Sequence, residues 1–401
     1  MPNQQHSFYH LGIAPKLLDV LERLKFVTPT PIQLKAIPVA LEGNDIVGIA
    51  QTGTGKTLAF GIPLVQRLSL TNGHALVLVP TRELALQVDE HLRKILHPFG
   101  YNSAVLIGGS SMHNQIQAIR KNPKVIIATP GRLIDHLQQK IVSLKDVNIL
   151  VLDEADRMLD MGFKPQVEQI LKSVSKNRQT LLFSATMPTD IMSLATKYMK
   201  LPIHMEIAPS GTAAERVIQE VFIVREESKK TLLRLLLNQY RGAVLLFART
   251  KIKARKITHI IRDMNHNVAE IHSDRTMGQR RQAIDGFKSG KFRVLVATDI
   301  AARGIDVSNI ELVINYDLPD DIENYVHRIG RTGRAGHEGR AISFATPDQS
   351  EDVRKIERMI RTNLTIVKHP EIPDEVFHVP RPITSSHTKR TFMPRRRSGR
   401  R

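Results

Sequence analysis

One stretch near the start of this chain constrains its fold more than any other. Residues 46–57 read IVGIAQTGTGKT, a short apolar run followed by a glycine-containing loop and a Lys-Thr pair. Gly53 and Gly55 allow the backbone to turn its N–H groups inward, and a helix that begins at the Lys-Thr pair adds a favourable dipole. The Lys56 ammonium can reach the β- and γ-phosphates of a nucleotide, and the Thr57 hydroxyl can hold Mg²⁺. The stretch therefore predicts a triphosphate-binding loop between a strand and a helix.

This loop departs from the general pattern at one position. The pattern G-x-x-x-x-G-K-[ST] has glycine where this chain has Ala50. Taken alone, the stretch is also compatible with an ordinary glycine-rich turn, so its interpretation depends on the rest of the chain.

A second apolar run ends in a cluster of acidic residues. Residues 149–152 are followed directly by Asp153, Glu154 and, two positions on, Asp156. Because the carboxyl ends of parallel strands meet at one edge of a sheet, we expect these carboxylates beside the phosphate-binding loop. Asp153 can then hold Mg²⁺, and Glu154 can orient and deprotonate an attacking water. Acids after a strand can also cap a helix, but their pairing with residues 46–57 favours nucleotide hydrolysis.

The distribution of apolar runs predicts an α/β fold with two domains. Short runs rich in Val, Ile and Leu alternate with amphipathic segments such as 81–96, which is typical of parallel sheets covered by helices on both faces. The expected strands are 45–50, 75–79, 104–107, 125–129, 149–153 and 180–184, then 217–224, 243–247, 268–271, 293–298, 312–316 and 341–345. We expect a first domain over residues 1–207, a linker over 208–216, a second domain over 217–367 and a basic tail over 368–401.

Charge points to a polyanionic partner. The formal net charge is +19, and residues 376–401 contain eight Arg or Lys and no Asp or Glu. Nucleic acid is the first candidate partner and an anionic membrane surface the second. The tail is expected to be disordered and to act as a sequence-independent RNA tether, with a purely solubilising tail as the alternative.

Several classes of protein are excluded or disfavoured by composition. The chain has no cysteine, so it contains neither disulfides nor thiolate metal sites. We find no signal-peptide pattern and no apolar run near 18 residues, so we expect no membrane span and a cytoplasmic location.

Ten motifs occur in the order found in one known family. They are FVTPTPIQ at 26–33, AQTGTGKT at 50–57, PTREL at 80–84, GG at 108–109, TPGR at 129–132, DEAD at 153–156, SAT at 184–186, LFART at 246–250, ATDIAARGID at 297–306 and YVHRIGRTGR at 325–334. From Phe8 to about Ala345 the chain resembles a DEAD-box RNA helicase of superfamily 2, and most of all the short bacterial RhlE-like members. The resemblance implies two tandem RecA-like domains, and Ala50 is the family's own form of the phosphate loop.

The resemblance implies ATP and Mg²⁺ as cofactors. Gln33 would read the adenine edge, and an aromatic ring at Phe26 or Phe8 would pack on the base. The implied nucleotide-binding residues are Phe8, Phe26, Thr28, Gln33, Gln51, Thr52, Gly53, Thr54, Gly55, Lys56, Thr57, Gly304 and Asp306. Thr57 and Asp153 would hold the metal. The implied catalytic residues are Lys56, Asp153, Glu154, Ser184, Thr186, His327, Arg331 and Arg334.

The same resemblance implies an RNA path along both domains. The residues that match the family's RNA-side motifs are Pro80, Thr81, Arg82, Gly109, Thr129, Pro130, Gly131, Arg132, Arg249, Thr298 and Asp299. They follow predicted strands, where loop N–H groups, hydroxyls and guanidinium groups can reach phosphates. One stretch departs from the family: Ser273 and Met277 stand where Gly and Gln are usual, while Arg280 is retained. The Gln–Arg coupling of this stretch is therefore in doubt.

We expect an RNA-dependent ATPase that separates short RNA duplexes locally and non-processively, acting as a monomer. An ATP-gated RNA clamp or assembly scaffold is the main alternative; a DNA translocase and an inactive RNA chaperone driven by the tail are others. Candidate assemblies are ribosomal or RNA-decay complexes, and the target RNA is not identified by the sequence.

Overall fold

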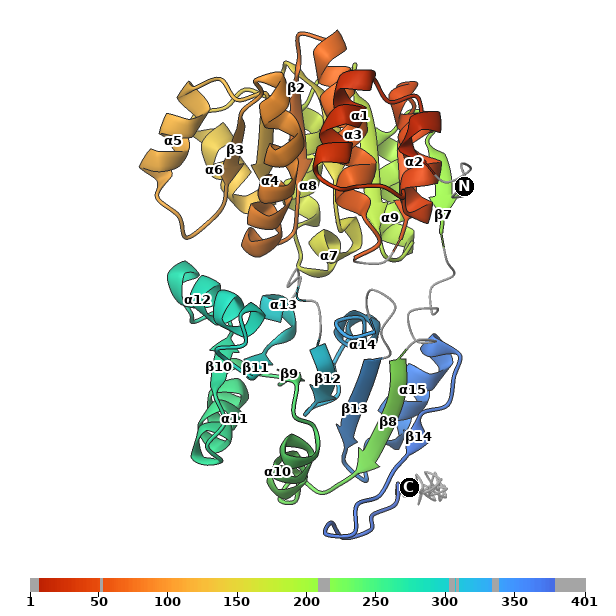
Figure 1. The fold of residues 1–401 in the computed structure, drawn as a ribbon, viewed down its shortest axis with the longest axis vertical. Coiled ribbons are helices and arrows are strands. Elements are labelled where there is room, and N and C mark those ends of the chain that lie inside the picture. The colour runs from red at the N-terminus through yellow and green to blue at the C-terminus, as the bar shows by residue number, and fades with distance from the viewer. Residues whose placement is uncertain are drawn as a thin grey trace, which may run out of the picture.

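The protein consists of two parallel seven-stranded sheets, each covered by helices on both faces and stacked end to end (Figure 1). The computed structural model describes residues 7–50, 53–207, 217–302, 307, 310–333 and 339–378. This confirms the predicted α/β fold with two similar units.

The first sheet has the strand order β3-β4-β2-β5-β6-β1-β7, with all neighbours parallel. Its strands are β1 (Ile46–Ile49), β2 (His74–Leu78), β3 (Ser103–Leu106), β4 (Val125–Ala128), β5 (Val147–Leu152), β6 (Gln179–Ser184) and β7 (Ile203–Glu206). The acidic residues follow β5, and the phosphate-binding loop follows β1. Both strands lie next to β6, so their carboxyl ends share one edge of the sheet.

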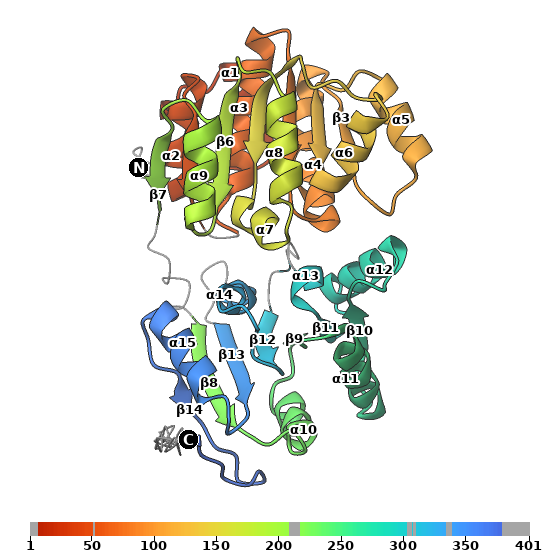
Figure 2. The same cartoon turned by 180° about the vertical axis from the view of Figure 1, so that it is seen from behind.

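Helices of the first domain form two layers (Figures 1 and 2). The short η2 (Phe8–His10), α1 (Pro15–Arg23), α2 (Pro31–Leu41), α3 (Lys56–Leu70) and α4 (Arg82–Leu96) build the core on one face. The opposite face is covered by α6 (Pro130–Gln138), α7 (Ala155–Asp160), α8 (Lys164–Ser173) and α9 (Thr189–Tyr198). The remaining elements are η3 (His97–Phe99) and α5 (Met112–Arg120).

The second sheet repeats the topology of the first. Its order is β10-β11-β9-β12-β13-β8-β14, which is the first order with every strand number raised by seven. Its strands are β8 (Val217–Ile223), β9 (Ala243–Phe247), β10 (Val268–Ile271), β11 (Val294–Ala297), β12 (Ile310–Asn315), β13 (Gly339–Ala345) and β14 (Thr365–Ile366). The repeat places β8 where β1 lies in the first domain, although no phosphate loop follows β8.

The helices of the second domain include those that face the first. They are α10 (Lys229–Gln239), α11 (Lys251–Asp263), α12 (Met277–Lys288), α13 (Asp299–Ala302), α14 (Glu323–Ile329) and α15 (Ser350–Ile360). Both views of the ribbon place α12, α13 and α14 on the side that faces the first domain, opposite α7 (Figures 1 and 2).

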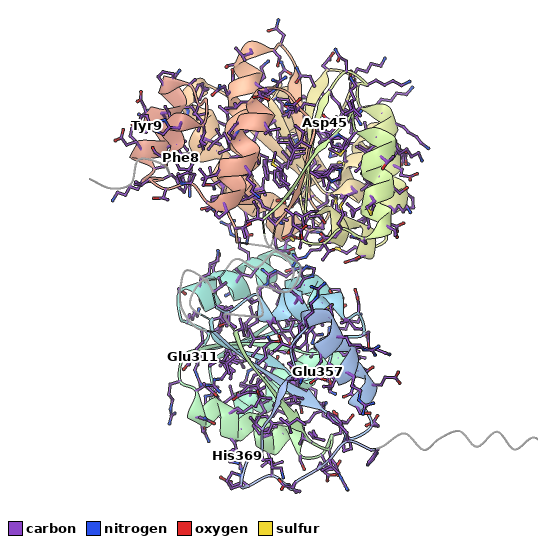
Figure 3. The ribbon with its side chains drawn as sticks, turned by 90° about the vertical axis from the view of Figure 1, so that its right-hand side faces the viewer. Phe8, Tyr9, Asp45, Glu311, Glu357 and His369 are labelled. Carbon is purple, nitrogen blue, oxygen red and sulfur yellow. The ribbon has the colours of Figure 1, made fainter. Side chains whose placement is uncertain are left out.

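Both domains have densely filled interiors, as the side chains in Figure 3 show. The figure labels Phe8 and Asp45 in the first domain and Glu311, Glu357 and His369 in the second. Among the described residues, no helix combines the length and the apolar character needed to cross a bilayer.

All twelve strands expected from the sequence are present, with ends shifted by a few residues at most. The edge strands β7 and β14 were not expected. Only one of the four residues of β7 is buried, and β14 has two exposed residues, so neither shows the continuous apolar pattern of a central strand.

The first part of the expected tail packs on the second domain. Ile372 is buried in its core, Phe377 packs against it, and the backbone N–H of His378 donates to the carbonyl of Pro347 at 2.8 Å. The expected linker 208–216 and residues 379–401, which carry the basic tail, lie outside the described residues.

Candidate active site between the two domains

The phosphate-binding loop leaves β1 and ends at the N-terminus of α3, as its sequence predicts. Gly53 and Gly55 both adopt positive φ, at 86° and 90°. The buried Lys56 ammonium donates to the carbonyl of Ala50 at 3.0 Å, which folds the side chain back over the loop. Thr54 and Thr57 lie in the described part of this loop, whereas Gln51 and Thr52 fall outside it.

Gln33 joins the adenine-side segment to this loop. Its Oε1 accepts from the N–H of Thr30 at 2.9 Å, and its Nε2 donates to the carbonyl of Gly55 at 3.0 Å. Each of these two atoms has capacity for one further hydrogen bond, so the amide can still meet a base.

The two aromatic candidates for packing on a base differ in exposure. Phe8 is 3% exposed and belongs to the core of the first domain, whereas Phe26 is 40% exposed. Thr28 is exposed on the same segment. Of the two rings, Phe26 is therefore the one that a base can reach without rearrangement of the core.

The acidic pair follows β5 in a conformation that few side chains adopt. Glu154 lies in the left-handed region, with φ 53° and ψ 51°, and precedes the first residue of α7. Its N–H donates to Asp153 Oδ1 at 3.0 Å, and its Oε2 accepts from the buried guanidinium of Arg157 at 2.6 Å. Strain of this kind clusters at functional sites, where the surrounding structure holds it in place.

Burial and nearby cations set different ionisation states for the two acids. Burial, together with repulsion from Glu154 and Asp156, raises the pKa of Asp153 to about 6 despite the opposing charge of Lys56. For Glu154, burial also disfavours the charge, but Arg157, Lys56 and Arg331 outweigh it and hold its pKa below the ordinary value. The site therefore keeps Glu154 ionised, while the Asp153 carboxylate is short of positive charge.

Asp156 ties the acidic segment to the end of β6. Its Oδ2 accepts from the N–H groups of Ala185 and Thr186, at 2.9 and 3.0 Å, and from the Thr186 hydroxyl at 3.1 Å. The N–H of Asp156 in turn donates to Ser184 Oγ at 3.3 Å. These hydrogen bonds join the DEAD and SAT segments, so Asp156 holds Ser184 and Thr186 beside the acidic pair.

The second domain contributes cations from α14 and the turn after it. Arg331 is 3% exposed, and its charge lowers the pKa of Glu154 in the other domain. His327, Arg328 and Arg331 line a small cavity together with Arg157 of the first domain. The structure thus brings Arg331 within electrostatic reach of Glu154, and His327 lies beside the Arg157 that pairs with Glu154. Arg334 lies outside the described residues, as do Gly304 and Asp306.

Asp299 has a protein partner that the sequence did not indicate. The Arg328 guanidinium donates to both of its carboxylate oxygens, at 2.5 and 2.7 Å, and also to the carbonyl of Asp317 at 2.6 Å. The preceding residue, Thr298, begins the turn that leads into α13. The carboxylate of Asp299 is therefore engaged by Arg328 and helps to hold this turn.

The predicted RNA-side residues of the first domain gather at one edge of the sheet. Pro80 and Thr81 follow β2, Gly109 follows β3, and residues 129–132 follow β4. The N–H of Leu84 donates to the Thr81 hydroxyl at 3.2 Å, which caps α4, and the Arg82 guanidinium lies against Gly108 and Gly109. Thr129 precedes α6, and Pro130 and Gly131 form the first turn of that helix. The Arg132 guanidinium donates to the carbonyl of Ser110 at 3.2 Å.

Arg249 lies at the corresponding edge of the second sheet. Its N–H donates to Asp317 Oδ2 at 3.1 Å, and its half-exposed side chain forms an ion pair with Asp320 at 3.2 Å. The guanidinium is therefore held near solvent, where a phosphate can compete for it.

The segment of the second domain that departs from the family pattern, around Met277 and Arg280, contacts the first domain directly. Arg280 and Glu83 form an ion pair at 2.8 Å with both side chains largely buried, although the two atoms are not aligned as a hydrogen bond. Met277 packs against the core of the first domain, and its Cγ lies 3.5 Å from the position that a Cβ on Gly109 would occupy. Arg280 thus couples to the other domain, and Met277 supplies an apolar contact in place of the usual amide.

The residues present fit a nucleotide with a divalent cation. A Cβ atom on Gly55 would approach Gln33 Nε2 to 2.5 Å, so the loop backbone is pressed close to the adenine-side segment. Burial raises the pKa of Asp153, and a cation beside the carboxylate would offset this effect by stabilising its charged form. Thr57 and Asp153 remain the predicted metal-holding residues.

Two residues of this site escaped the sequence argument. Arg157 and Arg328 are the largest fully buried side chains among the described residues, and each neutralises an acid of the site. A buried arginine has no local signature in a sequence, although the position of Arg157 directly after the four-residue acidic motif was a usable signal.

Comparisons with known proteins agree with this geometry. The DEAD/DEAH box helicase model matches residues 30–194, and the helicase conserved C-terminal domain model matches residues 227–336. The chain is 41% identical to the ATP-dependent rRNA helicase RRP3 of Meyerozyma guilliermondii over 379 residues, covering 94% of this chain and 79% of the relative. It is also 41% identical to the DEAD-box ATP-dependent RNA helicase CshA of Bacillus subtilis over 390 residues, covering 96% and 78%.

Solved structures show the same two-domain arrangement. Dbp5 of S. cerevisiae bound to RNA and ADP BeF3 superposes with a TM-score of 0.81 at 32% identity, covering 90% of this chain and 95% of that one. Mss116p bound to ssRNA and AMP-PNP gives 0.82 at 31% identity, covering 90% and 78%. A particular closeness to RhlE-like members stays a prediction. With its family-model matches, its relatives and its composite site between two RecA-like domains, the chain belongs to the DEAD-box family of ATP-dependent RNA helicases.

Proposed function

We propose that this helicase is an RNA-dependent ATPase that separates short RNA duplexes locally and non-processively. One observation carries the proposal: the charge of Arg331 in the second domain lowers the pKa of Glu154 in the first, across the domain boundary. Neither domain holds the whole hydrolytic set, so turnover depends on closure.

Each group of the site has a defined task in the proposed reaction. Lys56 binds the β- and γ-phosphates, and Glu154, kept ionised by its cationic neighbours, orients the attacking water and accepts its proton. Arg331 and Arg334 neutralise charge that develops on the γ-phosphate. Thr57 and Asp153 would hold Mg²⁺, which would supply positive charge against the phosphates. Because ADP and inorganic phosphate bind these groups less completely, hydrolysis favours reopening.

RNA is proposed to bind across the same boundary, at the loops after β2, β3, β4, β9 and β11. The similarity to Dbp5 and Mss116p, whose structures are described as bound to RNA and a nucleotide analogue, supports this placement. Contacts of this kind address phosphates and 2′-hydroxyls, so we expect little sequence preference.

Local action follows from the size of one closure step. Each base-pair step costs roughly 1.4 kcal/mol to open by the DNA stacking figure. One closure that bends a bound strand therefore disrupts a few base pairs, not a long duplex.

The test is duplex length. With excess ATP and a trap for released strands, the unwinding rate should fall steeply between about 8 and 16 base pairs, roughly following the added pairing energy. Glu154→Gln should bind ATP and RNA but lose turnover. A rate independent of duplex length, or a Glu154→Gln variant with parental turnover, would contradict the proposal.

An ATP-gated RNA clamp is the second candidate, favoured by the interdomain ion pair of Arg280 with Glu83. The two functions differ in the lifetime of the RNA complex. A clamp would hold RNA for many minutes with ATP while releasing few strands, whereas a helicase would release RNA within each hydrolytic cycle.

Several finer assignments complete the proposal. We propose that the protein acts as a monomer, because one chain supplies both halves of the site. We also propose that it acts in the cytoplasm. The name of RRP3, an rRNA helicase, makes ribosomal RNA complexes the first candidate partners and RNA-decay complexes the second.

A further inference from the structure

Two neighbouring loops of the first domain, one after β3 and one after β4, lie at the proposed RNA edge. The strands pair in parallel, with Leu106 opposite Ala128, and the N–H of Thr129 donates to the carbonyl of Leu106 at 3.0 Å. The loop of residues 108–110 and the loop of residues 129–132 therefore start side by side. Among the described residues, no further backbone hydrogen bond joins these two loops, so their spacing depends on side chains.

A buried amide bridges the two loops. Gln115 of α5 is 4% exposed, and its Nε2 donates to the carbonyl of Ile107, at the base of the first loop, at 2.9 Å. Its Oε1 lies 3.0 Å from Nε2 of His136, which is fully buried on α6, the helix that the second loop begins. One side chain thus spans from the root of one loop to the body of the helix behind the other.

The hydrogen-bond pattern fixes the state of His136. Because Gln115 Oε1 can only accept, His136 Nε2 must carry the proton and donate. His136 Nδ1 is buried and has no hydrogen-bond partner among the described residues. Burial lowers the pKa of His136, Arg132 lowers it further, and Asp135 opposes both. The ring is therefore neutral, and its only hydrogen bond in the described structure is the one to Gln115.

A direct contact reinforces the same spacing. Arg132, in the first turn of α6, donates to the carbonyl of Ser110 at 3.2 Å. This exposed bond involves a guanidinium that a phosphate can draw away. The buried Gln115–His136 bond faces no such competition, so it is the contact that persists when RNA arrives.

We propose that Gln115 and His136 are positioning residues that hold the two loops at the spacing needed to contact successive RNA phosphates at once. The inference rests on the proposed RNA path. Neither side chain touches the nucleotide-binding loop, so their effect should be confined to RNA. If the spacing is lost, the first loop still binds but the second no longer reaches its phosphate.

The test compares Gln115→Leu with Gln117→Leu, which alters an exposed glutamine of the same helix. Gln115→Leu should raise the RNA concentration for half-maximal ATPase by about tenfold, as expected when one charge-assisted hydrogen bond to a phosphate is lost. Turnover at saturating RNA and KM for ATP should stay within twofold of the parent. Gln117→Leu should match the parent in all three.

Salt dependence separates positioning from simple destabilisation. Losing one phosphate contact should reduce the slope of log affinity against log salt by about 0.7. A general loss of stability would lower Tm and turnover while leaving the slope unchanged. His136→Phe removes only the α6 end of the bridge and should give the same pattern. This second variant tests the inference even if Gln115→Leu does not fold.

An RNA half-saturation within twofold of the parent, an equal shift in Gln117→Leu, or an unchanged salt slope would overturn the inference. If the parent itself showed no RNA-stimulated ATPase, the proposed function would fail instead, so the two failures are distinguishable.

Discussion

At the scale of single residues, the acidic pair shows how one buried site gives two carboxylates different tasks. Asp153 and Glu154 are adjacent and equally buried, yet their pKa values move in opposite directions. The difference arises because Arg157 lies against Glu154 and not against Asp153. Neighbouring charge, not burial, therefore assigns the base.

The raised pKa of Asp153 predicts a pH-dependent stability in the absence of nucleotide. Below about pH 4 the carboxyl is protonated in both folded and unfolded chains. Between the ordinary value and about 6 only the unfolded form ionises, so this group destabilises the fold increasingly as pH rises. Asp153→Asn should therefore be more stable than the parent at pH 8, by about 1–3 kcal/mol, and equal to it near pH 4.

Chemical denaturation at the two pH values measures this difference. Thermal denaturation with Mg²⁺ and ATP provides the control, because a cation beside the Asp153 carboxylate should stabilise the parent more than the variant, which lacks that charge. An advantage of Asp153→Asn that is equally large at pH 4 would refute the pKa argument.

At the scale of elements, the phosphate loop depends on a glycine for two separate reasons. Gly55 has φ 90°, and a Cβ there would lie 2.5 Å from Gln33 Nε2. The first reason is a backbone conformation that costs other residues about 1–2 kcal/mol. The second is contact with the adenine-side segment.

Gly55→Ala should therefore destabilise the chain by about 2–4 kcal/mol and weaken ATP binding, since both strain and collision act. Gly100→Ala is the matched control, because Gly100 also has positive φ, at 72°, but has nothing within 4 Å of its Cβ position. The control should show only the strain and retain ATP affinity. Equal losses in the two variants would mean that the contact with Gln33 is unimportant.

Prediction from the sequence also differs between kinds of element. The central strands could be predicted because a strand that is buried on both faces has a continuous apolar sequence, as in residues 149–152. The edge strands β7 and β14 were missed because exposure removes that run. Their pairing with β1 and β8 is decided by backbone hydrogen bonds, which carry no side-chain pattern.

At the scale of the whole molecule, closure depends on contacts between residues far apart in the chain. A groove of about 940 Å³ is lined by residues of α4 and α12, among them Glu83 and Met277. The ion pair of Glu83 with Arg280 bridges the two domains beside it. It is largely buried, so removing one partner leaves an uncompensated charge.

Glu83→Gln and Arg280→Gln should each raise the RNA concentration for half-maximal ATPase by about tenfold or more, because an unpaired buried charge disfavours the closed form. The double variant should be no worse than either single one. The pair of Glu220 with Arg340, within the second domain, is the control. Its neutralisation should lower Tm without changing RNA affinity, and additive losses at Glu83 and Arg280 would argue against a direct pair.

The C-terminal charges act at the same scale. Removing residues 379–401 eliminates eight Arg or Lys and leaves the packed segment through His378 intact. RNA affinity should fall and its salt dependence should flatten, by about 0.7 for each lost phosphate contact, with turnover at saturating RNA unchanged. A tail of equal length with Gln at the eight positions should behave like the deletion, and a scrambled tail like the parent. An unchanged salt slope would leave only a solubilising role.

The sequence by itself determined the parallel α/β fold, the phosphate loop and the acidic pair, because each depends on residues close together in the chain. Only the tertiary structure decided which charges meet: Arg331 with Glu154, Arg328 with Asp299, and Arg280 with Glu83. It also buried Phe8 and left Phe26 exposed. Local periodicity reports which face of an element is buried, whereas partners across two domains are set by strand order and by the closure of one domain on the other.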